Sequence, residues 1–135
     1  MIYVDTSALV KLIRTEEESD RLADWLDRRT EIRWITSSLT EFELPRAIIR
    51  AAALEGLSAV PSVLARLDKF EIDPVIRSTA AAYQDSALRS LDAIHLATAQ
   101  VAASAASLTA FVTYDRRLRE AACDLGMTTV APGST

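Results

Sequence analysis

The sequence predicts an α/β domain in which a mainly parallel sheet of about five short strands carries helices on both faces. The first observation is that short β-prone runs alternate with longer segments of helical periodicity, which is typical of strands joined by crossover helices. Such connections are right-handed and leave neighbouring strands parallel. The second observation is size, because 135 residues, half of them hydrophobic and only three of them glycine, suffice for one packed core. We therefore expect a single domain over residues 1–135.

The first half of the chain is predicted to hold two strands and four helices. Residues 5–7 carry helix-capping side chains directly after the first strand, and the second helix is expected to be capped by Thr15 or a residue nearby, with Glu16, Glu17 and Glu18 at its N-terminal end. In the third helix we expect Phe42 and Leu44 on the inner face, and Pro45 in or near the first turn, where proline is tolerated. The expected elements are a strand at 2–4, a helix over 8–13, a helix from about residue 15, a strand at 33–37, a helix at about 40–54 ended by Gly56, and a helix at 58–69.

The second half repeats the alternation of strands and helices. Pro74 is well placed to begin a helix, and Gly126 to end one. The expected elements are a strand at 70–72, helices at 74–88 and 91–106, a strand at 110–113, a helix at 116–125 and a strand at 128–130.

Composition and charge exclude several classes of protein. The chain has 15 basic and 19 acidic residues, a net charge of −4, which argues against binding nucleic acid through bulk charge. The one cysteine, Cys123, has no partner for an internal disulfide and fits a reducing compartment. The most apolar stretch, residues 91–108, is interrupted by polar residues and falls short of the roughly 20 apolar residues that span a bilayer. We therefore expect a cytoplasmic protein that does not bind membranes.

Four acidic residues occupy positions that favour a shared site. Asp5 and Asp115 directly follow predicted strands, where sites form in open parallel sheets. Asp92 begins an otherwise apolar helix, and Glu43 lies on the helix after the second strand. Each acid alone has an ordinary alternative, as a helix cap or a solvated helix residue. Together in one cleft they would repel one another unless a hard divalent cation bound them, which indicates Mg²⁺ or Mn²⁺.

Four segments around these acids resemble the PIN domain family, and more narrowly the VapC ribonuclease toxins of type II toxin–antitoxin systems. The segments occur in the order and at the distances of that family, and the resemblance covers essentially the whole chain. They are IYVDTSALVK at residues 2–11, FELPRA at 42–47, LDAIHLATA at 91–99 and FVTYDRRL at 111–118.

The resemblance implies a Mg²⁺- or Mn²⁺-dependent endoribonuclease that hydrolyses RNA phosphodiester bonds. It implies a VapB-like antitoxin, a homodimer, and operator DNA bound only through the antitoxin, whose tail covers the groove of the toxin. Trp25 and Leu26 are expected either in the antitoxin interface or in the core. The implied metal-binding and catalytic residues are Asp5, Glu43, Asp92 and Asp115, with Asp5 and Asp92 as the most direct ligands, Glu43 or Asp115 as the base, and Thr6, Ser7 and Thr113 in support.

Basic side chains near the acids are candidate contacts for RNA phosphates, although each is also an ordinary solvated helix residue. Arg46 and Arg116 are favoured because they follow the proposed site most closely in sequence. The full set is Lys11, Arg14, Arg46, Arg50, Arg116 and Arg117.

Other residues have simpler interpretations. His95 follows Asp92 by three residues, but without a second such pair we expect a packed or hydrogen-bonded helix histidine rather than a zinc ligand. Cys123 is expected in the core, and Trp34 in the core or an interface. Glu41 is a rival to Glu43 that a helix would point elsewhere. Two other functions remain open: a catalytically silent PIN-type binding module, and an aspartate-dependent phosphatase, which would need an acid where Ser7 stands.

Overall fold

Five short parallel strands form the sheet at the centre of the computed structural model, which describes residues 1–134. The strand order is β3-β2-β1-β4-β5, so the N-terminal strand is central and the chain adds strands on either side of it. All four pairings are parallel, which confirms the predicted α/β architecture. The strands are β1 (Ile2–Val4), β2 (Trp34–Ser37), β3 (Asp68–Phe70), β4 (Ala110–Val112) and β5 (Thr129–Val130).

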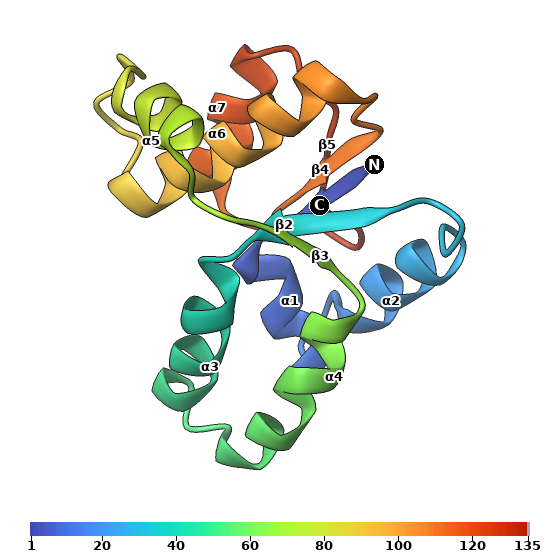
Figure 1. Cartoon of the computed structure of the whole chain (residues 1–135). Helices are drawn as coiled ribbons and strands as arrows, with labels where there is room; N and C mark the ends of the chain where they lie inside the picture. The colour runs from blue at the N-terminus through green and yellow to red at the C-terminus, as the bar shows by residue number, and fades with distance from the viewer. Residues whose placement is uncertain (135) are drawn as a thin grey trace.

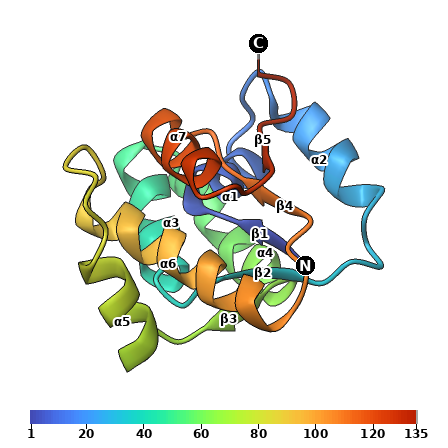
Figure 2. The same ribbon diagram turned by 90° about the horizontal axis from the view of Figure 1, so that it is seen from above.

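Helices cover both faces of the sheet (Figure 1). On the lower face in that view are α1 (Thr6–Ile13), α2 (Ser19–Asp27), α3 (Thr40–Arg50) and α4 (Val60–Ala65), with a 3₁₀ helix, η1 (Leu54–Ala59), between the last two. On the upper face are α5 (Pro74–Ala81), α6 (Ser90–Ala105) and α7 (Arg116–Asp124). Figure 2 shows α6 between α5 and α7.

The core consists of two apolar layers separated by the sheet. Because successive side chains of a strand point to opposite faces, Ile2 and Val4 enter one layer and Tyr3 enters the other. The first layer packs against α1–α4, and the second against α6 and α7. Tyr3 is fully buried and stacks on Phe111, with ring centroids 4.9 Å apart. The Tyr3 hydroxyl therefore lies in the protein interior, between the sheet and α6.

Several helix ends differ from the predicted ones. The predicted helix at 40–54 ends at Arg50, because Ala52 adopts a positive φ of 55° that turns the chain. The predicted helix at 58–69 is replaced by η1 and the short α4, in whose first turn Pro61 lies. Strand β3 therefore begins at Asp68, two residues before the predicted strand, and α5 ends at Ala81 rather than 88.

The start of α2 lies a few residues after Thr15, at the end of the acidic run. Thr15 does not cap this helix, which begins at Ser19 after Glu18 and has no side-chain cap. The Ser19 hydroxyl instead accepts a hydrogen bond from the Glu16 backbone N–H at 2.8 Å, which ties the preceding loop to the helix.

Some side chains lie elsewhere than their sequence neighbours suggest. Phe42 is 60% exposed rather than on the inner face of α3, and Cys123 is exposed rather than in the core. Leu26 and Trp34 are buried, as a core role predicts, whereas Trp25 is half-buried beneath the Arg29 guanidinium at 3.9 Å. Pro45 lies inside α3, one turn from its start, and the helix continues past it.

Within residues 1–134, no helix has both the length and the apolar character needed to cross a membrane.

Candidate active site

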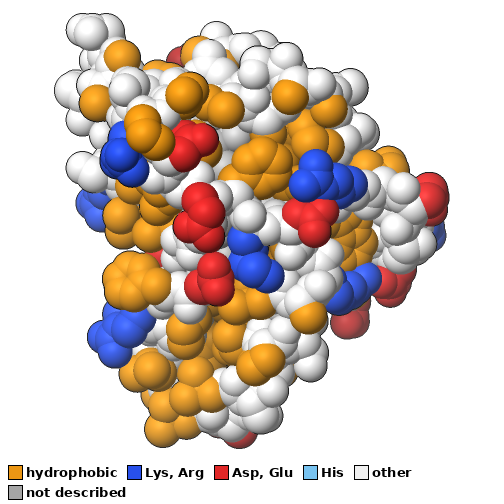
Figure 3. All heavy atoms as spheres, in the orientation of Figure 1, with side chains coloured by type: hydrophobic (Ala, Val, Ile, Leu, Met, Phe, Trp, Pro, Cys, Tyr) orange, Lys and Arg blue, Asp and Glu red, His pale blue; other side chains and the backbone are white. Residues whose placement is uncertain are grey.

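All four predicted acids line one pocket of about 410 Å³ at the carboxyl edge of the sheet. Asp5 follows β1, Glu43 projects from α3, Asp92 from the first turn of α6, and Asp115 precedes α7. In Figure 3 acidic side chains gather at the centre of the visible face, between the upper and lower helices, with basic side chains beside them. The rival acid Glu41 is exposed and does not line this pocket.

Helix capping explains how the local sequence places two of these acids. Asp5 is the N-cap of α1 and accepts a hydrogen bond from the Ala8 N–H at 3.3 Å. Asp115 is the N-cap of α7 and accepts from the Leu118 N–H at 3.1 Å. The structural alternative given for each is therefore correct, and it is compatible with a site. Together with α6, these helices direct three N-termini toward one edge of the sheet, where their dipoles favour negative charge.

Two hydroxyl groups hold the Asp5 carboxylate in place. Ser7 donates to Oδ1 at 2.6 Å and Thr113 donates to Oδ2 at 2.9 Å. Thr113 also accepts from the Asp115 N–H at 3.1 Å, and Ser7 accepts from the Tyr114 N–H at 2.9 Å. These hydroxyls therefore connect β1 to the segment after β4, and Asp5 is only 3% exposed.

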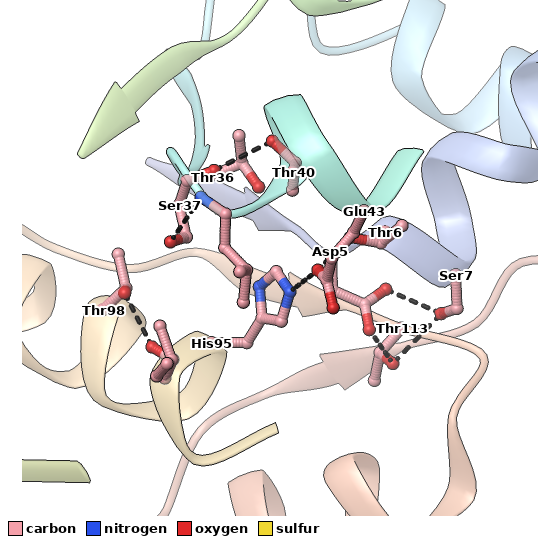
Figure 4. Close-up of polar contacts among 12 residues, drawn as sticks. Asp5, Thr6, Ser7, Thr36, Ser37, Thr40, Glu43, His95, Thr98 and Thr113 are labelled. Carbon is pink, nitrogen blue, oxygen red and sulfur yellow. Dashed lines mark hydrogen bonds and ion pairs between the residues drawn. The ribbon is translucent and has the colours of Figure 1, made fainter. Parts of the chain in front are cut away.

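Glu43 is held by a different set of donors. Thr6 donates to its Oε1 at 2.7 Å, and His95 Nε2 lies 2.6 Å from the same oxygen (Figure 4). On the other side of the imidazole, Nδ1 lies 2.6 Å from the Tyr3 hydroxyl. The prediction of a hydrogen-bonded helix histidine is confirmed, but its two partners were not predicted. Both ring nitrogens are occupied, which leaves none for a zinc ion shared with Asp92.

The pKa values of the acids differ in direction. Burial raises the pKa of Asp5 despite the hydrogen bonds from Ser7 and Thr113. Burial and then the charge of Asp115 raise the pKa of Asp92. Burial also acts on Glu43, but the hydrogen bonds from His95 and Thr6 outweigh it and lower the pKa. The negative charges of Asp5 and Asp92 are thus incompletely balanced by the protein, and a bound cation would balance them.

The chemistry of this donor set fits a hard divalent cation, which prefers carboxylate oxygens. As the side chains stand, no three His, Cys, Asp or Glu residues within 1–134 lie close enough together to hold a metal ion. Asp92 and Asp115 are half-exposed, and no other side chain of the described residues donates a hydrogen bond to either. Rotation of these two side chains is therefore the change that binding would require.

Four of the six candidate RNA-binding residues line the acidic pocket or a hollow beside it. Arg46 and Arg50 line the acidic pocket, whereas Arg116 and Arg117, with Arg89, line an adjoining hollow of about 450 Å³ that shares Asp92 and Asp115 with the pocket. Arg89 was not predicted, because it precedes α6 in sequence rather than following an acid.

Lys11 and Arg14 lie outside both hollows. The Lys11 ammonium is 2.6 Å from Glu18 and 3.2 Å from Glu16, and its side chain is largely buried. These ion pairs give Lys11 a structural role that the sequence did not indicate.

The fold and the site together define the class of protein. A family model for the PIN domain matches residues 2–123, most of the chain. Ribonuclease VapC35 of Mycobacterium tuberculosis strain H37Rv is 75% identical over 133 residues, covering 98% of both chains. Ribonuclease VapC46 of the same strain is 40% identical over 131 residues, covering 97% of both. The chain therefore belongs to the PIN domain family and, within it, to the VapC-type proteins.

Two solved structures share the fold. A toxin–antitoxin complex from Klebsiella pneumoniae matches with a TM-score of 0.71 at 20% identity, covering 98% of both chains. A structure of FitAB bound to an IR36 DNA fragment matches with a TM-score of 0.69 at 19% identity, covering 100% of this chain and 97% of the other. At these identities the likeness concerns the fold alone.

Proposed function

We propose that this protein is a Mg²⁺- or Mn²⁺-dependent endoribonuclease, the toxin of a toxin–antitoxin pair. The observation that carries the proposal is the convergence of four acids from separate parts of the chain on one pocket, with arginines lining it and the adjoining hollow. The relatives that are 75% and 40% identical are named as ribonucleases. A cytoplasmic location belongs to the same proposal, since RNA and a partner protein would be met there.

In this proposal Asp5, Glu43, Asp92 and Asp115 hold the cation, Asp5 and Asp92 most directly. When bound, the cation would acidify water and neutralise charge on the phosphate. Glu43 or Asp115 accepts a proton from the attacking water, and the arginines bind neighbouring RNA phosphates. In-line attack leaves a 5′-phosphate and a 3′-hydroxyl. Thr6, Ser7 and Thr113 keep the carboxylates in place, as their hydrogen bonds to Glu43 and Asp5 suggest.

The proposed partners follow from the same site. A VapB-like antitoxin would inhibit the enzyme by placing its tail over the acidic pocket, where a positively charged side chain could balance the carboxylates. The solved structures of similar fold are a toxin–antitoxin complex and a DNA-bound FitAB, which supports the expectation of an antitoxin. We further propose a homodimer, with operator DNA bound only through the antitoxin.

The direct test is cleavage of total RNA by the purified protein with Mg²⁺ or Mn²⁺ and with EDTA. We expect cleavage with the metals and none with EDTA. Glu43→Gln and its neighbour Glu41→Gln form a matched pair, because only Glu43 lines the pocket. Glu43→Gln should abolish cleavage and Glu41→Gln should not. Equal activity in EDTA, or equal loss in both variants, would reject the proposal. A folded protein that binds RNA without cutting it would favour the silent binding module.

The phosphatase alternative finds no support in the site. Ser7 occupies the position where a second acid would be needed, and its hydroxyl donates to Asp5. Release of inorganic phosphate from a phosphate monoester by the purified protein would be needed to revive this alternative.

A further inference from the structure

His95 is a buried polar residue to which the proposed reaction gives no task. It is the only histidine of the chain, lies on α6 three residues after Asp92, and is 3% exposed. Its two ring nitrogens contact residues of separate elements, Tyr3 of β1 and Glu43 of α3. Figure 4 shows the contact between His95 and Glu43. Both contacts are 2.6 Å long. A packing role alone would not require a polar partner on each side of the ring.

The Tyr3 hydroxyl sets the direction of these hydrogen bonds. The buried Tyr3 hydroxyl lies 2.6 Å from Nδ1, and a phenol carries its proton at neutral pH and can donate it. A protonated phenol donates to Nδ1 of a neutral imidazole, which places the ring proton on Nε2. An ionised Glu43 carboxylate can only accept, so its 2.6 Å contact with Nε2 also requires the proton on that nitrogen, and His95 Nε2–H donates to Glu43 Oε1.

The surrounding core fixes the orientation of the imidazole. Tyr3 stacks on Phe111 in an almost parallel arrangement, and its ring meets the His95 ring edge-on, with centroids 5.9 Å apart. These rings lie in the layer beneath α6 and away from solvent. His95 therefore transmits the rigidity of the core to the carboxylate that it contacts.

At Glu43 the result is an unequal use of the two carboxylate oxygens. Oε1 accepts from both His95 and Thr6, whereas no hydrogen bond from the described residues reaches Oε2. The donors come from α6 and α1, on opposite sides of the sheet. One oxygen is thus anchored by two elements, and the other remains available to a cation or a water molecule.

We propose that His95 is a positioning residue for Glu43, held in the required tautomer by Tyr3. It anchors Oε1 so that Oε2 is presented to the divalent cation of the site. This inference rests on the proposed function, and it extends the site to two residues, Tyr3 and His95, that do not touch the cation. Residues that orient a metal ligand typically change metal affinity or activity 10–100-fold when they are replaced.

The first test is the tautomer of His95, observed by nuclear magnetic resonance of the metal-free protein with ¹⁵N-labelled histidine. Because the chain has one histidine, the signals need no assignment. We expect the proton on Nε2, and a shift of that resonance in Glu43→Gln. A proton on Nδ1 with none on Nε2, or no response to Glu43→Gln, would overturn the proposal.

The second test is Mn²⁺ affinity, measured by calorimetry alongside thermal unfolding and RNA cleavage. His95→Leu should weaken Mn²⁺ binding by about 10–100-fold. His95→Gln, whose amide can donate to Glu43, should recover most of the loss, and Tyr3→Phe should lose less than His95→Leu. The control is Thr98→Val, a buried α6 position whose hydroxyl donates only to its own helix, at Ile94; its Mn²⁺ affinity should stay within about 2-fold of the wild type, well below the expected effect.

Two results would contradict the proposal: wild-type Mn²⁺ affinity in His95→Leu, or no recovery in His95→Gln. If His95→Leu does not fold, the Mn²⁺ affinities of His95→Gln and Tyr3→Phe are compared with that of the wild type instead. Weakened Mn²⁺ binding in His95→Gln together with wild-type Mn²⁺ binding in Tyr3→Phe would then contradict the proposal. A wild-type protein that cuts no RNA would reject the proposed function, whereas the tautomer would still decide the role of His95.

Discussion

The acidic pocket has two halves that the protein treats differently. The inner pair, Asp5 and Glu43, is anchored by donors from other side chains, among them Thr113 and His95. The outer pair, Asp92 and Asp115, receives no side-chain donor from the described residues and is half-exposed. The inner pair is thus arranged before any ligand arrives, and the outer pair is left to respond to it. This difference explains how a site can contain four acids without three of them lying at metal-binding distance.

Replacing one of the four acids should have the largest effect, which is a loss of RNA cleavage. Asp5→Asn and Asp92→Asn should each reduce RNA cleavage more than about 100-fold, beyond the effect of replacing a supporting residue. Cleavage assays with purified variants at saturating Mn²⁺ measure this.

The two variants should differ in stability. Asp92→Asn removes a charge that Asp115 repels, so the metal-free protein should unfold at an equal or higher temperature. Asp5→Asn disturbs the carboxylate that accepts from Ser7 and Thr113, and should lower that temperature. Equal destabilisation by both would contradict the distinction between the two pairs.

Breaking the anchor of the inner pair should affect stability and activity together. Thr113→Val removes the donor to Asp5 Oδ2 and the acceptor for the Asp115 N–H. Leaving buried groups without partners should cost about 1–3 kcal/mol in the free energy of unfolding, and cleavage should fall about 10–100-fold. Denaturant unfolding and cleavage assays check both, with Thr98→Val as the buried-threonine control. Unchanged cleavage in Thr113→Val would show that the anchor is dispensable.

Metal binding should depend on pH because the pKa values of Asp5 and Asp92 are raised. Protonation of these groups stabilises the fold below their ordinary pKa near 3.8, and this contribution is lost as the pH rises through the raised values. A divalent cation takes over at neutral pH. At 100 times its Kd it should add about 2.7 kcal/mol at pH 7, seen as a higher unfolding temperature, and much less near pH 4. If the metal raised the unfolding temperature equally at both pH values, the metal would bind at a site other than the acidic pocket.

The smallest expected effect concerns the arginines. Arg46→Ala, in the pocket, should weaken RNA cleavage at low substrate concentration several-fold and reduce its salt dependence. Arg14→Ala, outside both hollows, is the matched control and should not. Lys11→Ala should also leave cleavage intact, because Lys11 is paired with Glu16 and Glu18. Equal losses in Arg46→Ala and Arg14→Ala would remove the pocket arginine from the RNA-binding surface.

The acids could be located from sequence because strand ends and helix starts are local signals. Asp5 directly follows a short β-prone run, and a parallel sheet brings such positions to one edge. The anchoring of Glu43 could not be predicted from sequence. His95 is 52 residues from Glu43 along the chain, and Tyr3 is 92 residues from His95. Only the folded register brings them together, and nothing in LDAIHLATA distinguishes a buried anchor from a core histidine.

Helix ends and exposed side chains were predicted less well for a related reason. The exposure of Phe42 depends on how α3 is rotated against α1 and η1, and its neighbours in sequence do not fix that rotation.

The negative net charge, which argued against a nucleic-acid enzyme, is partly explained by the acids that the pocket concentrates, while the arginines gather beside them.

The central claim is that the four acids act as one cation site that performs RNA cleavage. The most direct measurement is to titrate Mn²⁺ into the wild type, Asp5→Asn and Asp92→Asn, and to record bound metal by electron paramagnetic resonance and RNA cleavage on the same samples. Binding and cleavage should saturate together in the wild type, and both should be lost in each variant. Cleavage that is complete before metal binds, or that persists in the variants, would contradict the account.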